Sequence, residues 1–480
     1  MKSPINWQHL FAPSSVAVIG ASNTPGSWGY GIMNHLLTSK KRKLYPVNPN
    51  AAEVLGIKAY ASVTEIPGPV ELAVIVVSAK RVLKIIEECL QKGVKAAVIV
   101  SGGFAETGEE GKKLEDEVAK IARQGGIRFI GPNTMGHVDT YSQLSTLAWT
   151  WETPPGPVAL ISQSGNYGHR IIHRGMISGI GFSKFVCTGN EADLHLEDYF
   201  EYVAQDKHTR IITAYIEGLR EGRRFFQIAK ETTASKPVIV IKGGATRGSA
   251  RAAKSHTATL AGSDEIYTAV FRQAGVLRVD DDDELCDLVT AMLYQPLPRG
   301  NRIGILTIGG GLGVMAAEAC EKEGLELAPL APATMEKLDD YLPPRWSHGN
   351  PVDMAGISMA ENPVIFPSLW ALMEDEGVDA VLLQAPVGAN TNRLATMFDS
   401  RQIKAVREAE ENSLSTLGKR VKQLGKPVFM VKPAVEFATD PEVASLFSRV
   451  GIPVYPSPRR AAKVLNHLAW YRRYLSPPTR

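Results

Sequence analysis

Short apolar runs alternate with longer segments of mixed polarity along most of the chain. In the first third these runs are rich in β-branched residues and mostly lie a helix length apart, and they comprise Ser15–Ile19, Leu44–Val47, Leu72–Val77, Ala96–Val100 and Arg128–Ile130. Continuous apolar runs of four to six residues are typical of strands that are buried on both faces. Their alternation with helical segments predicts a parallel sheet with crossover helices.

The same pattern occurs twice more, each time after a proline-rich interruption. The interruption at 149–157 contains three prolines, and a second one lies at 295–300. The strands expected after the first are Val158–Ile161, Phe182–Val186, Ile211–Ile216 and Val238–Ile241. Those expected after the second are Arg302–Ile308, Val378–Leu383 and Val428–Val431. We therefore expect an α/β protein of three doubly wound, Rossmann-like or flavodoxin-like domains, at residues 1–150, 151–298 and 299–480.

The composition argues against several classes of function. Of the 480 residues 44% are hydrophobic, and 53 basic against 50 acidic residues leave a formal charge of only +3, which gives no support for nucleic-acid binding. No apolar run approaches the ~20 residues that span a bilayer, and residues 1–11 do not resemble a signal peptide. We therefore expect no membrane association and a cytoplasmic location. The four cysteines form no CxxC pair, so we expect buried free thiols and no metal site.

The first expected strand ends in a glycine-rich turn, Gly20-Ala-Ser22, which continues through Pro25-Gly26 to a helical pattern. Such a turn lets backbone N–H groups approach a phosphate at the start of a helix. The spacing is not GxGxxG, and the next strand ends in Asn48-Pro49 with no carboxylate for a ribose hydroxyl. These features argue against a nicotinamide cofactor and favour another nucleotide such as CoA. A tight turn without a ligand is the alternative.

Two further polar loops follow strands of the same sheet. They are Ser101-Gly-Gly-Phe104-Ala-Glu106 and Gly131-Pro-Asn133. Both should lie at the carboxyl edge, where α/β proteins bind their ligands. Their glycines could equally be ordinary turn residues, but three polar loops at one edge favour a binding site.

Each of the other two domains begins with a strand-to-helix turn that could bind an anion. The second domain opens with Ser162-Gln163-Ser164-Gly165, and the third with Gly309-Gly310-Gly311-Leu-Gly313. Because helix N-termini favour negative charge, two of them could hold one phosphate from opposite sides. Plain helix caps are the alternative.

The segment from Lys242 to Thr257 combines small residues, bases and His256. Bases attract phosphate, and a histidine at the end of such a loop is a candidate carrier of a phosphoryl group. Upstream, Glu217 ends an expected strand and could orient the imidazole through its second nitrogen. Both residues could instead be solvated surface groups.

Taken in order, these motifs resemble the alpha subunit of ADP-forming acyl-CoA synthetases, a family related to succinyl-CoA synthetase. The succession is Gly20-Ala-Ser22, Pro46-Val-Asn-Pro49, Ser162-Gln-Ser-Gly165, Gly189-Asn-Glu-Ala-Asp193, Ser255-His-Thr257 with Leu260-Ala-Gly262, and Gly349-Asn-Pro-Val-Asp353. The chain departs from the family at Ala258, where glycine is frequent, and at Leu312, where proline is common. Neither departure removes a functional side chain.

The resemblance implies a CoA-binding, phosphohistidine-carrying subunit of an acid–CoA ligase, which interconverts acid, CoA and ATP with acyl-CoA, ADP and phosphate. His256 would carry the phosphoryl group, and Glu217 would support it. The residues implied for CoA are Gly20, Ser22, Pro25, Gly26, Asn48, Ser78, Ser101 and Asn133. Those implied for phosphate are Ser162, Gln163, Ser164, Gly165, Gly310, Gly311 and Gly313.

After three Rossmann-like domains, no stretch is left for an ATP-grasp module. The resemblance therefore implies a separate ATP-grasp beta subunit that binds ATP or ADP with Mg²⁺, in a heterotetramer. The substrates would be a small carboxylic acid or its acyl-CoA, and phosphate, with the acyl group left open. A non-catalytic CoA-binding regulatory module is the alternative function. An NAD-dependent oxidoreductase is disfavoured by the missing GxGxxG and acidic residue.

Overall fold

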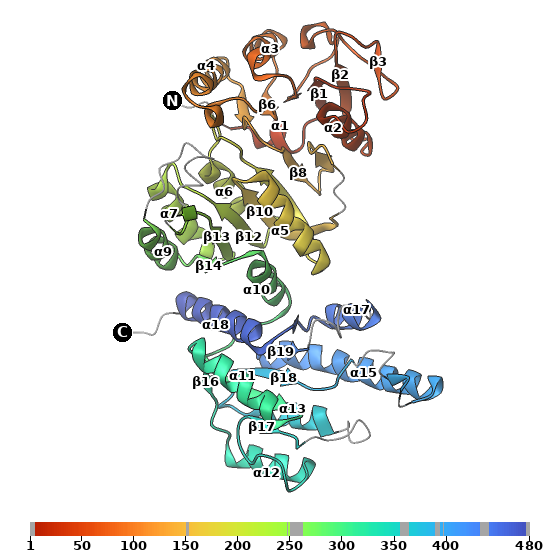
Figure 1. Ribbon diagram of the computed structural model, residues 1–480, viewed down its shortest axis with the longest axis vertical. Coiled ribbons are helices and arrows are strands. Elements are labelled where there is room, and N and C mark those ends of the chain that lie inside the picture. The colour runs from red at the N-terminus through yellow and green to blue at the C-terminus, as the bar shows by residue number, and fades with distance from the viewer. Residues whose placement is uncertain are drawn as a thin grey trace. The chain divides into compact units, whose positions relative to one another are not determined.

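The computed structural model describes residues 5–149, 153–246, 248–249, 263–355, 364–388, 394–396, 398–432 and 441–476. The chain divides into two compact units, Met1–Leu285 and Cys286–Arg480. The first unit contains two large sheets and the second contains one, each flanked by helices (Figure 1). The predicted fold class, three doubly wound α/β sheets, is confirmed. Among the helices of the described residues, none is long and apolar enough to cross a membrane.

The first sheet has the strand order β2-β1-β5-β6-β7, and all its pairings are parallel. Its strands are β1 Ser15–Ile19, β2 Lys43–Val47, β5 Leu72–Ile75, β6 Ala96–Ile99 and β7 Arg128–Ile130. Its helices are α1 Trp7–Phe11, α2 Trp28–Leu37, α3 Ala79–Lys92 and α4 Glu109–Gln124. Smaller elements are the hairpin of β3 Glu53–Val54 with β4 Ile57–Lys58, and the 3₁₀ turns η1 Val63–Glu65 and η2 Ala105–Thr107.

Alternate residues of the first sheet enter two different cores. Val16 and Val18 of β1 pack with α1 and α2, whereas Ala17 and Ile19 pack with α3 and α4. Successive side chains of a strand point to opposite faces. Both faces are therefore covered, which explains why the strand is apolar throughout.

The second sheet has the order β14-β13-β12-β10-β11-β8-β9. Its parallel strands are β10 Pro155–Ser162, β11 Phe182–Cys187, β12 Ile211–Ile216, β13 Val238–Lys242 and β14 Leu277–Val279. Its helices are α5 Gly165–Ile177, α6 Leu196–Gln205, α7 Gly222–Thr233 and α9 Asp264–Gln273, and α10 Asp282–Tyr294 crosses the boundary between the units. Residues of α6, α7 and α9 share one core with this sheet and with the α2 face of the first sheet.

Two short antiparallel strands, β8 His137–Asp139 and β9 Leu144–Ser145, extend the second sheet beyond β11. They follow directly after the last strand of the first sheet, so the chain passes from one sheet to the other before residue 150. Buried polar partners hold β8 in place. His137 Nε2 donates to Leu10 O at 2.7 Å, and Lys184 Nζ lies 3.1 Å from a carboxylate oxygen of Asp139.

The second unit has one parallel sheet of order β16-β15-β18-β19-β20, and β17 also pairs with β15. Its strands are β15 Arg302–Thr307, β16 Glu326–Leu327, β17 Val352–Asp353, β18 Ala380–Gln384, β19 Val428–Val431 and β20 Val454–Tyr455. Its helices are α11 Gly310–Lys322, α12 Pro332–Tyr341, α13 Ile365–Glu374, α15 Ser400–Leu424, α17 Pro441–Val450 and α18 Pro458–Leu475. Helices α12, α13 and α15 share a core with the sheet, and α11 packs against α18.

The four cysteines are buried and none of them forms a disulfide, as the sequence predicts. Burial raises the pKa of the thiols of Cys89 and Cys320 to about 12. Because the thiolate is the reactive form, these two side chains behave as small apolar core residues.

Candidate active site

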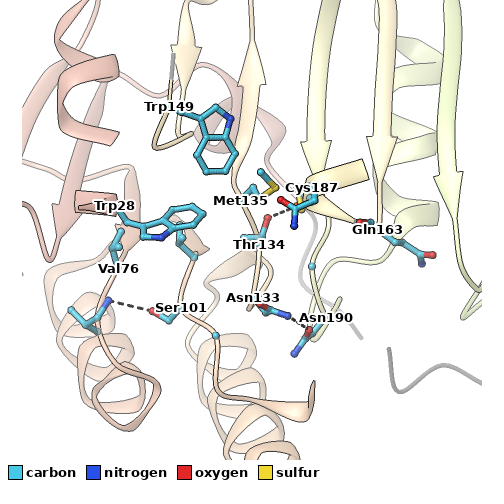
Figure 2. Close-up of a pocket in the computed structure, with 17 residues that line it drawn as sticks. Trp28, Val76, Ser101, Asn133, Thr134, Met135, Trp149, Gln163, Cys187 and Asn190 are labelled. Atoms are coloured by element: carbon cyan, nitrogen blue, oxygen red, sulfur yellow. Dashed lines mark hydrogen bonds between the residues drawn. The ribbon is translucent and has the colours of Figure 1, made fainter. Parts of the chain in front are cut away.

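A pocket of about 540 Å³ lies where loops of the two sheets in the first unit meet (Figure 2). Its walls come from the carboxyl ends of β5, β6 and β7 on one side and of β10 and β11 on the other. The residues that line it are Trp28, Val76, Val77, Val100, Ser101, Gly102, Asn133, Thr134, Met135, Trp149, Gln163, Ser164, Gly165, Asn166, Cys187, Gly189 and Asn190. Loops at the carboxyl edges of parallel strands are the usual ligand-binding positions of α/β folds.

Two of the residues predicted for CoA line this pocket. Ser101 follows β6, and its Oγ accepts from the backbone N–H of Val77 at 3.3 Å (Figure 2). Asn133 follows β7 in the left-handed region, at φ +57°, and its Nδ2 donates to Asn190 Oδ1 at 3.2 Å. The first contact fixes the β5 and β6 loops to each other, and the second ties the β7 loop to the neighbouring sheet.

The other residues predicted for CoA lie in turns at the same edge of the first sheet but do not line the pocket. They are Gly20, Ser22, Pro25, Gly26, Asn48 and Ser78. Gly20 has φ +97°, and a Cβ there would lie 2.2 Å from the carbonyl oxygen of Val76. Asn48 Nδ2 donates to Ala21 O at 2.8 Å, which holds the β1 and β2 turns together. Gly26 has φ +82° and open space around it.

An apolar wall that the sequence analysis missed completes the CoA side of the pocket. Trp28 on α2 meets Trp149 edge to face, with ring centroids 5.2 Å apart, and Met135 also lines the pocket (Figure 2). Trp28 remains 41% exposed. A large aromatic side chain exposed beside a cavity is suited to contact with a ligand, and the Trp next to the first glycine turn is the sequence signal that could have identified it.

The turn after β10 forms the opposite wall and begins helix α5. Ser164 is the N-cap, and its Oγ accepts from Tyr167 N at 3.3 Å. Ser162 is fully buried, and its Oγ donates to the carbonyl oxygen of Ser164 at 2.6 Å. A Cβ at Gly165 would lie 1.9 Å from Met135 Sδ, so a larger residue there would have to displace the Met135 side chain. The pocket therefore receives the N-terminus of a 13-residue helix, where an anion is favoured.

Gln163 connects this turn to Glu217. Glu217 follows β12 and is 8% exposed, and its backbone N–H donates to Gln163 Oε1 at 2.6 Å. The predicted phosphate residue and the predicted supporting carboxylate are therefore neighbours, although 54 positions separate them in the sequence. Lys242 Nζ donates to the carbonyl oxygen of Glu217 at 2.9 Å from the end of β13.

A partly buried tyrosine on β12, Tyr215, lies two residues before Glu217. Burial together with the charge of Glu217 raises the pKa of the Tyr215 hydroxyl. A hydroxyl that stays protonated is a permanent donor. Such a donor can orient a neighbouring carboxylate, which a group that supports an imidazole requires.

The Gly189-Asn-Glu-Ala-Asp193 motif, recognised in the sequence without a role, joins the two walls. Asp193 Oδ2 accepts from Arg128 Nε at 2.8 Å and from Phe129 N at 3.0 Å, both on β7. Asn190 Nδ2 donates to Glu115 Oε2 at 2.8 Å. Neither contact could be found from spacing alone, because the partners lie on β7 and α4, far away in the sequence.

The remaining predicted phosphate residues belong to the second unit. Gly310, Gly311 and Gly313 form the first turn of α11 after β15. A Cβ on Gly313 would lie 3.1 Å from atoms of Pro351 and Thr307, whereas Gly311 has open space. The turn is a second helix start with exposed backbone. His256, the predicted phosphoryl carrier, lies outside the described residues.

Three family profiles match consecutive parts of the chain. They are a CoA binding domain over residues 14–139, a succinyl-CoA ligase like flavodoxin domain over 155–292 and a Ligase-CoA domain over 303–395. Their order agrees with the three sheets, and the pocket lies between loops of the first two matches. Fold, pocket and profiles together define a CoA ligase of the succinyl-CoA ligase type.

Relatives identify the class more closely. The chain is 42% identical to the acetate–CoA ligase (ADP-forming) II subunit alpha of Pyrococcus furiosus, over 95% of both chains. It is also 42% identical to the ADP-forming acetate–CoA ligase I of Archaeoglobus fulgidus, over 78% of this chain and 54% of that longer one. The acetyl-coenzyme A synthetase 1 of Candidatus Korarchaeum cryptofilum, solved with phosphate and ADP, superposes with a TM-score of 0.83 at 32% identity, over 99% of this chain and all of that one.

The chain belongs to the family of ADP-forming acetate–CoA ligase alpha subunits. The predicted resemblance is thereby confirmed, as is the predicted function, the CoA-binding subunit of an acid–CoA ligase that forms ADP. The alternative of a regulatory module without catalysis is disfavoured, because the matching Korarchaeum structure holds phosphate and ADP.

Proposed function

We propose that this chain performs the thioester half of the ligase reaction in the pocket of the first unit and transfers the phosphoryl group to His256. The observation that supports the proposal is that CoA-side residues and an anion-type helix start line this pocket, and that Gln163 connects the pocket to the Glu217 strand end. Ser101 and Asn133 line one wall, Ser164 and Gly165 line the other, and Gln163 links that wall to Glu217.

The proposed chemistry has two steps on this chain. In the first, a phosphate oxygen attacks the carbonyl carbon of acyl-CoA, the C–S bond breaks, and CoA leaves as the thiol with a proton. In the second, an imidazole nitrogen of His256 attacks phosphorus of the acyl phosphate, and the P–O bond breaks to release the carboxylate. Dividing the transfer between two covalent steps lowers each barrier.

The residues around the pocket have separate roles in this scheme. The N–H groups at the start of α5 stabilise the phosphate and the developing negative charge. Glu217 accepts a hydrogen bond from the second nitrogen of the imidazole, which raises the nucleophilicity of the first. We propose the Gly310–Gly313 turn of the second unit as a further phosphate-binding helix start. The turns that carry Gly20, Ser22, Pro25, Gly26, Asn48 and Ser78 would bind the nucleotide part of CoA.

The nucleotide half of the reaction would take place on a partner. The Pyrococcus relative is named subunit alpha, and the matching Archaeoglobus ligase is a single longer chain of which this one covers 54%. We propose that the partner is an ATP-grasp beta subunit that binds ADP or ATP with Mg²⁺, in a heterotetramer. We further propose three domains, 1–150, 151–298 and 299–480, and a cytoplasmic location.

The test is phosphorylation of the isolated chain. Incubated with an acyl-CoA panel and inorganic phosphate without nucleotide, the protein should gain one phosphoryl group in intact mass spectra recorded under mild conditions. His256→Asn should abolish the gain and Glu217→Gln should slow it. His208→Asn is the matched control, because His208 stacks on Tyr141 away from the pocket. Labelling that persists in His256→Asn, or no labelling of the wild-type chain across the panel, would contradict the proposal.

The isolated chain should not form acyl-CoA from acid, CoA and ATP. Full turnover by the single purified chain would exclude the partner, whatever the result of the labelling experiment.

A further inference from the structure

The side-chain amide of Gln163 uses its whole hydrogen-bonding capacity on its neighbours. Its Oε1 accepts from the backbone N–H groups of Glu217 and Gly218 at 2.6 and 3.1 Å. Its Nε2 donates to Gly218 O at 2.8 Å and to Glu191 Oε1 at 3.0 Å. The residue is 6% exposed. An amide has two donors and two acceptor lone pairs, so none is left for a ligand unless one of these bonds breaks.

Glu191 completes this arrangement from the other side. It is 3% exposed and adopts φ +57°, a conformation that non-glycine residues adopt only when their surroundings hold them there. Thr188 Oγ1 donates to its Oε1 at 2.8 Å, and Arg220 Nε lies 3.6 Å from its Oε2. Glu191 is therefore fixed between the loop after β11 and the strand end that carries Glu217.

The adjacent residue, Asn190, extends the contacts to the first sheet. Asn190 lines the pocket and bonds to Glu106 in η2, Glu115 in α4 and Asn133 in the loop after β7, all of which flank the first sheet. Arg220, three residues after Glu217, donates to the backbone oxygen of Asn190 at 2.7 Å. An unbroken series of hydrogen bonds thus connects the CoA-side loops with the end of β12.

We infer that Gln163 and Glu191 are positioning residues for Glu217, which they hold at a fixed place relative to the loops that line the pocket. This inference rests on the proposed role of Glu217 in supporting the phosphohistidine. In this interpretation the Gln163 side chain bonds only to protein groups, and the backbone of the α5 turn binds the phosphate. Mispositioning of a catalytic group by about 1 Å can cost 100-fold in rate, so loss of either residue should slow the transfer strongly.

A double-mutant cycle on the labelling reaction tests the inference. Gln163→Leu should slow phosphohistidine formation by about 10- to 100-fold. If Gln163 acts through Glu217, the double variant with Glu217→Gln should be no slower than the slower single variant. Multiplication of the two effects would show that Gln163 acts independently, for example as a phosphate ligand, and would overturn the inference.

The chain offers a matched control for this substitution. Gln295, in the second unit, is 7% exposed, donates to Gly451 O at 2.6 Å and accepts from Val428 N at 2.9 Å. Gln295→Leu removes the same kind of buried backbone bonds, so it should lower the melting temperature similarly while labelling stays within about threefold of wild type. Equal slowing by the two variants would mean that Gln163 has only a structural role.

If Gln163→Leu does not fold, the variants Gln163→Glu and Glu191→Gln test the same inference in the labelling assay. Gln163→Glu retains the acceptor for Glu217 but loses the donor and places a second carboxylate next to Glu191. Glu191→Gln preserves volume and removes the charge opposite Arg220. Both variants should slow labelling by about 10-fold or more, whereas Glu410→Gln should not. Glu410 is an equally buried carboxyl, 4% exposed, that accepts from Gly388 N and pairs with Arg407.

The pH profile gives a signature that a merely structural role would not produce. Burial raises the pKa of Glu191 to about 7. Two charged groups face Glu191, Arg220 from the loop after β12 and Glu197 from α6. The hydroxyl of Tyr199 and the thiol of Cys187 lie nearby. Glu191→Gln imitates the protonated form. The ratio of wild-type to variant rates should therefore rise as pH increases through about 7, and the titration of His256 and of phosphate cancels in this ratio. A ratio that is constant across this range would overturn the role of Glu191.

The experiments distinguish failure of the proposed function from failure of the inference about Gln163 and Glu191. If Glu217→Gln labels as fast as wild type, the proposed function of Glu217 is wrong. If Glu217→Gln is slow while Gln163→Leu behaves like Gln295→Leu, the inference fails and the proposed function stands.

Discussion

Gly26 is the position where the proposed CoA site can be tested with the least damage to the fold. It has φ +82°, and a Cβ there would have nothing within 4 Å. Alanine at Gly26 therefore adds no clash and costs only the left-handed backbone conformation, about 1–2 kcal/mol. Gly20, in the same turn, is unsuitable because its Cβ would lie 2.2 Å from the carbonyl oxygen of Val76.

The expected effect on CoA is larger than the effect on stability. If the nucleotide approaches the backbone of this turn, a methyl group on Gly26 occupies the space of the approaching phosphate. The Kd for CoA should then rise at least about tenfold, equivalent to 1.4 kcal/mol. The melting temperature should fall by about 2–4 °C for each kcal/mol lost, as expected for a body of this size. Calorimetric titration with CoA and a thermal melt of each variant measure both quantities.

Gly93 provides the matched control. It caps α3 at φ +78°, also has nothing within 4 Å of a built Cβ, and lies at the opposite edge of the sheet from the ligand-binding loops. Gly93→Ala should lose the same stability and bind CoA normally. If Gly26→Ala and Gly93→Ala bind CoA equally well, the Gly20–Gly26 turn is not part of the CoA site and the assignment by motif is refuted.

Three further predictions concern the first unit. Burial lowers the pKa of His137 from 6.5 to about 4, so between these pH values the unfolded chain binds a proton that the folded chain does not. The free energy of unfolding, measured in urea, should therefore fall by up to roughly 3 kcal/mol as the pH drops from 6.5 to about 4. A His137→Gln variant that shows the same fall would contradict this explanation. Asp193→Ala removes the carboxylate opposite the buried Arg128 and should cost about 3–5 kcal/mol, whereas the double change with Arg128→Met should recover part of the loss; no recovery would mean that the ion pair is not the cause. CoA should alter the tryptophan fluorescence of the wild-type chain and do so less in Trp28→Phe, and an equal change in both would place CoA away from this wall.

The central strands could be predicted from the sequence because they are buried on both faces. The expected Ser15–Ile19, Ile211–Ile216 and Val428–Val431 have the same bounds in the structure. Continuous apolar character is required there, since every residue of such a strand contacts a helix on one face or the other. Edge strands need not be apolar throughout. In addition, β16, β17 and β20 are only two residues long, which is too short to give a recognisable hydrophobic pattern.

Strand β8 shows why the junction between the sheets was not predicted. Its sequence, His137-Val-Asp139, contains one apolar residue, yet all three are buried. The polar side chains are tolerated because Leu10, Lys184 and Thr146 satisfy them. These partners lie up to 127 positions away in the chain, and hydrogen bonds over such separations leave no local signal.

In the candidate site too, features with a local cause could be predicted from the sequence, and contacts between distant segments could not. The turns at Gly20, Ser101 and Ser162 could be found from the sequence because glycine and hydroxyl residues directly after a strand have a local structural cause. The Gln163–Glu191 contact could not, because it joins loops 28 positions apart whose approach depends on strand order. Glu191 also follows a polar stretch that is typical of an ordinary surface loop, and only the structure shows that it is buried.

A buried ionic contact of the first unit explains how a pocket between two sheets can keep its shape. Asp193, between β11 and α6, bonds to Arg128 on β7 of the first sheet, with Oδ2 2.8 Å from Nε. A buried ion pair contributes little net stability, but it strongly penalises any arrangement that separates its partners. Relative sliding of the sheets would leave these charges unpaired in the interior. The loops that carry Asn133 and Gln163 are therefore held in register before any ligand arrives, and the binding energy of CoA and phosphate need not be spent on assembling them.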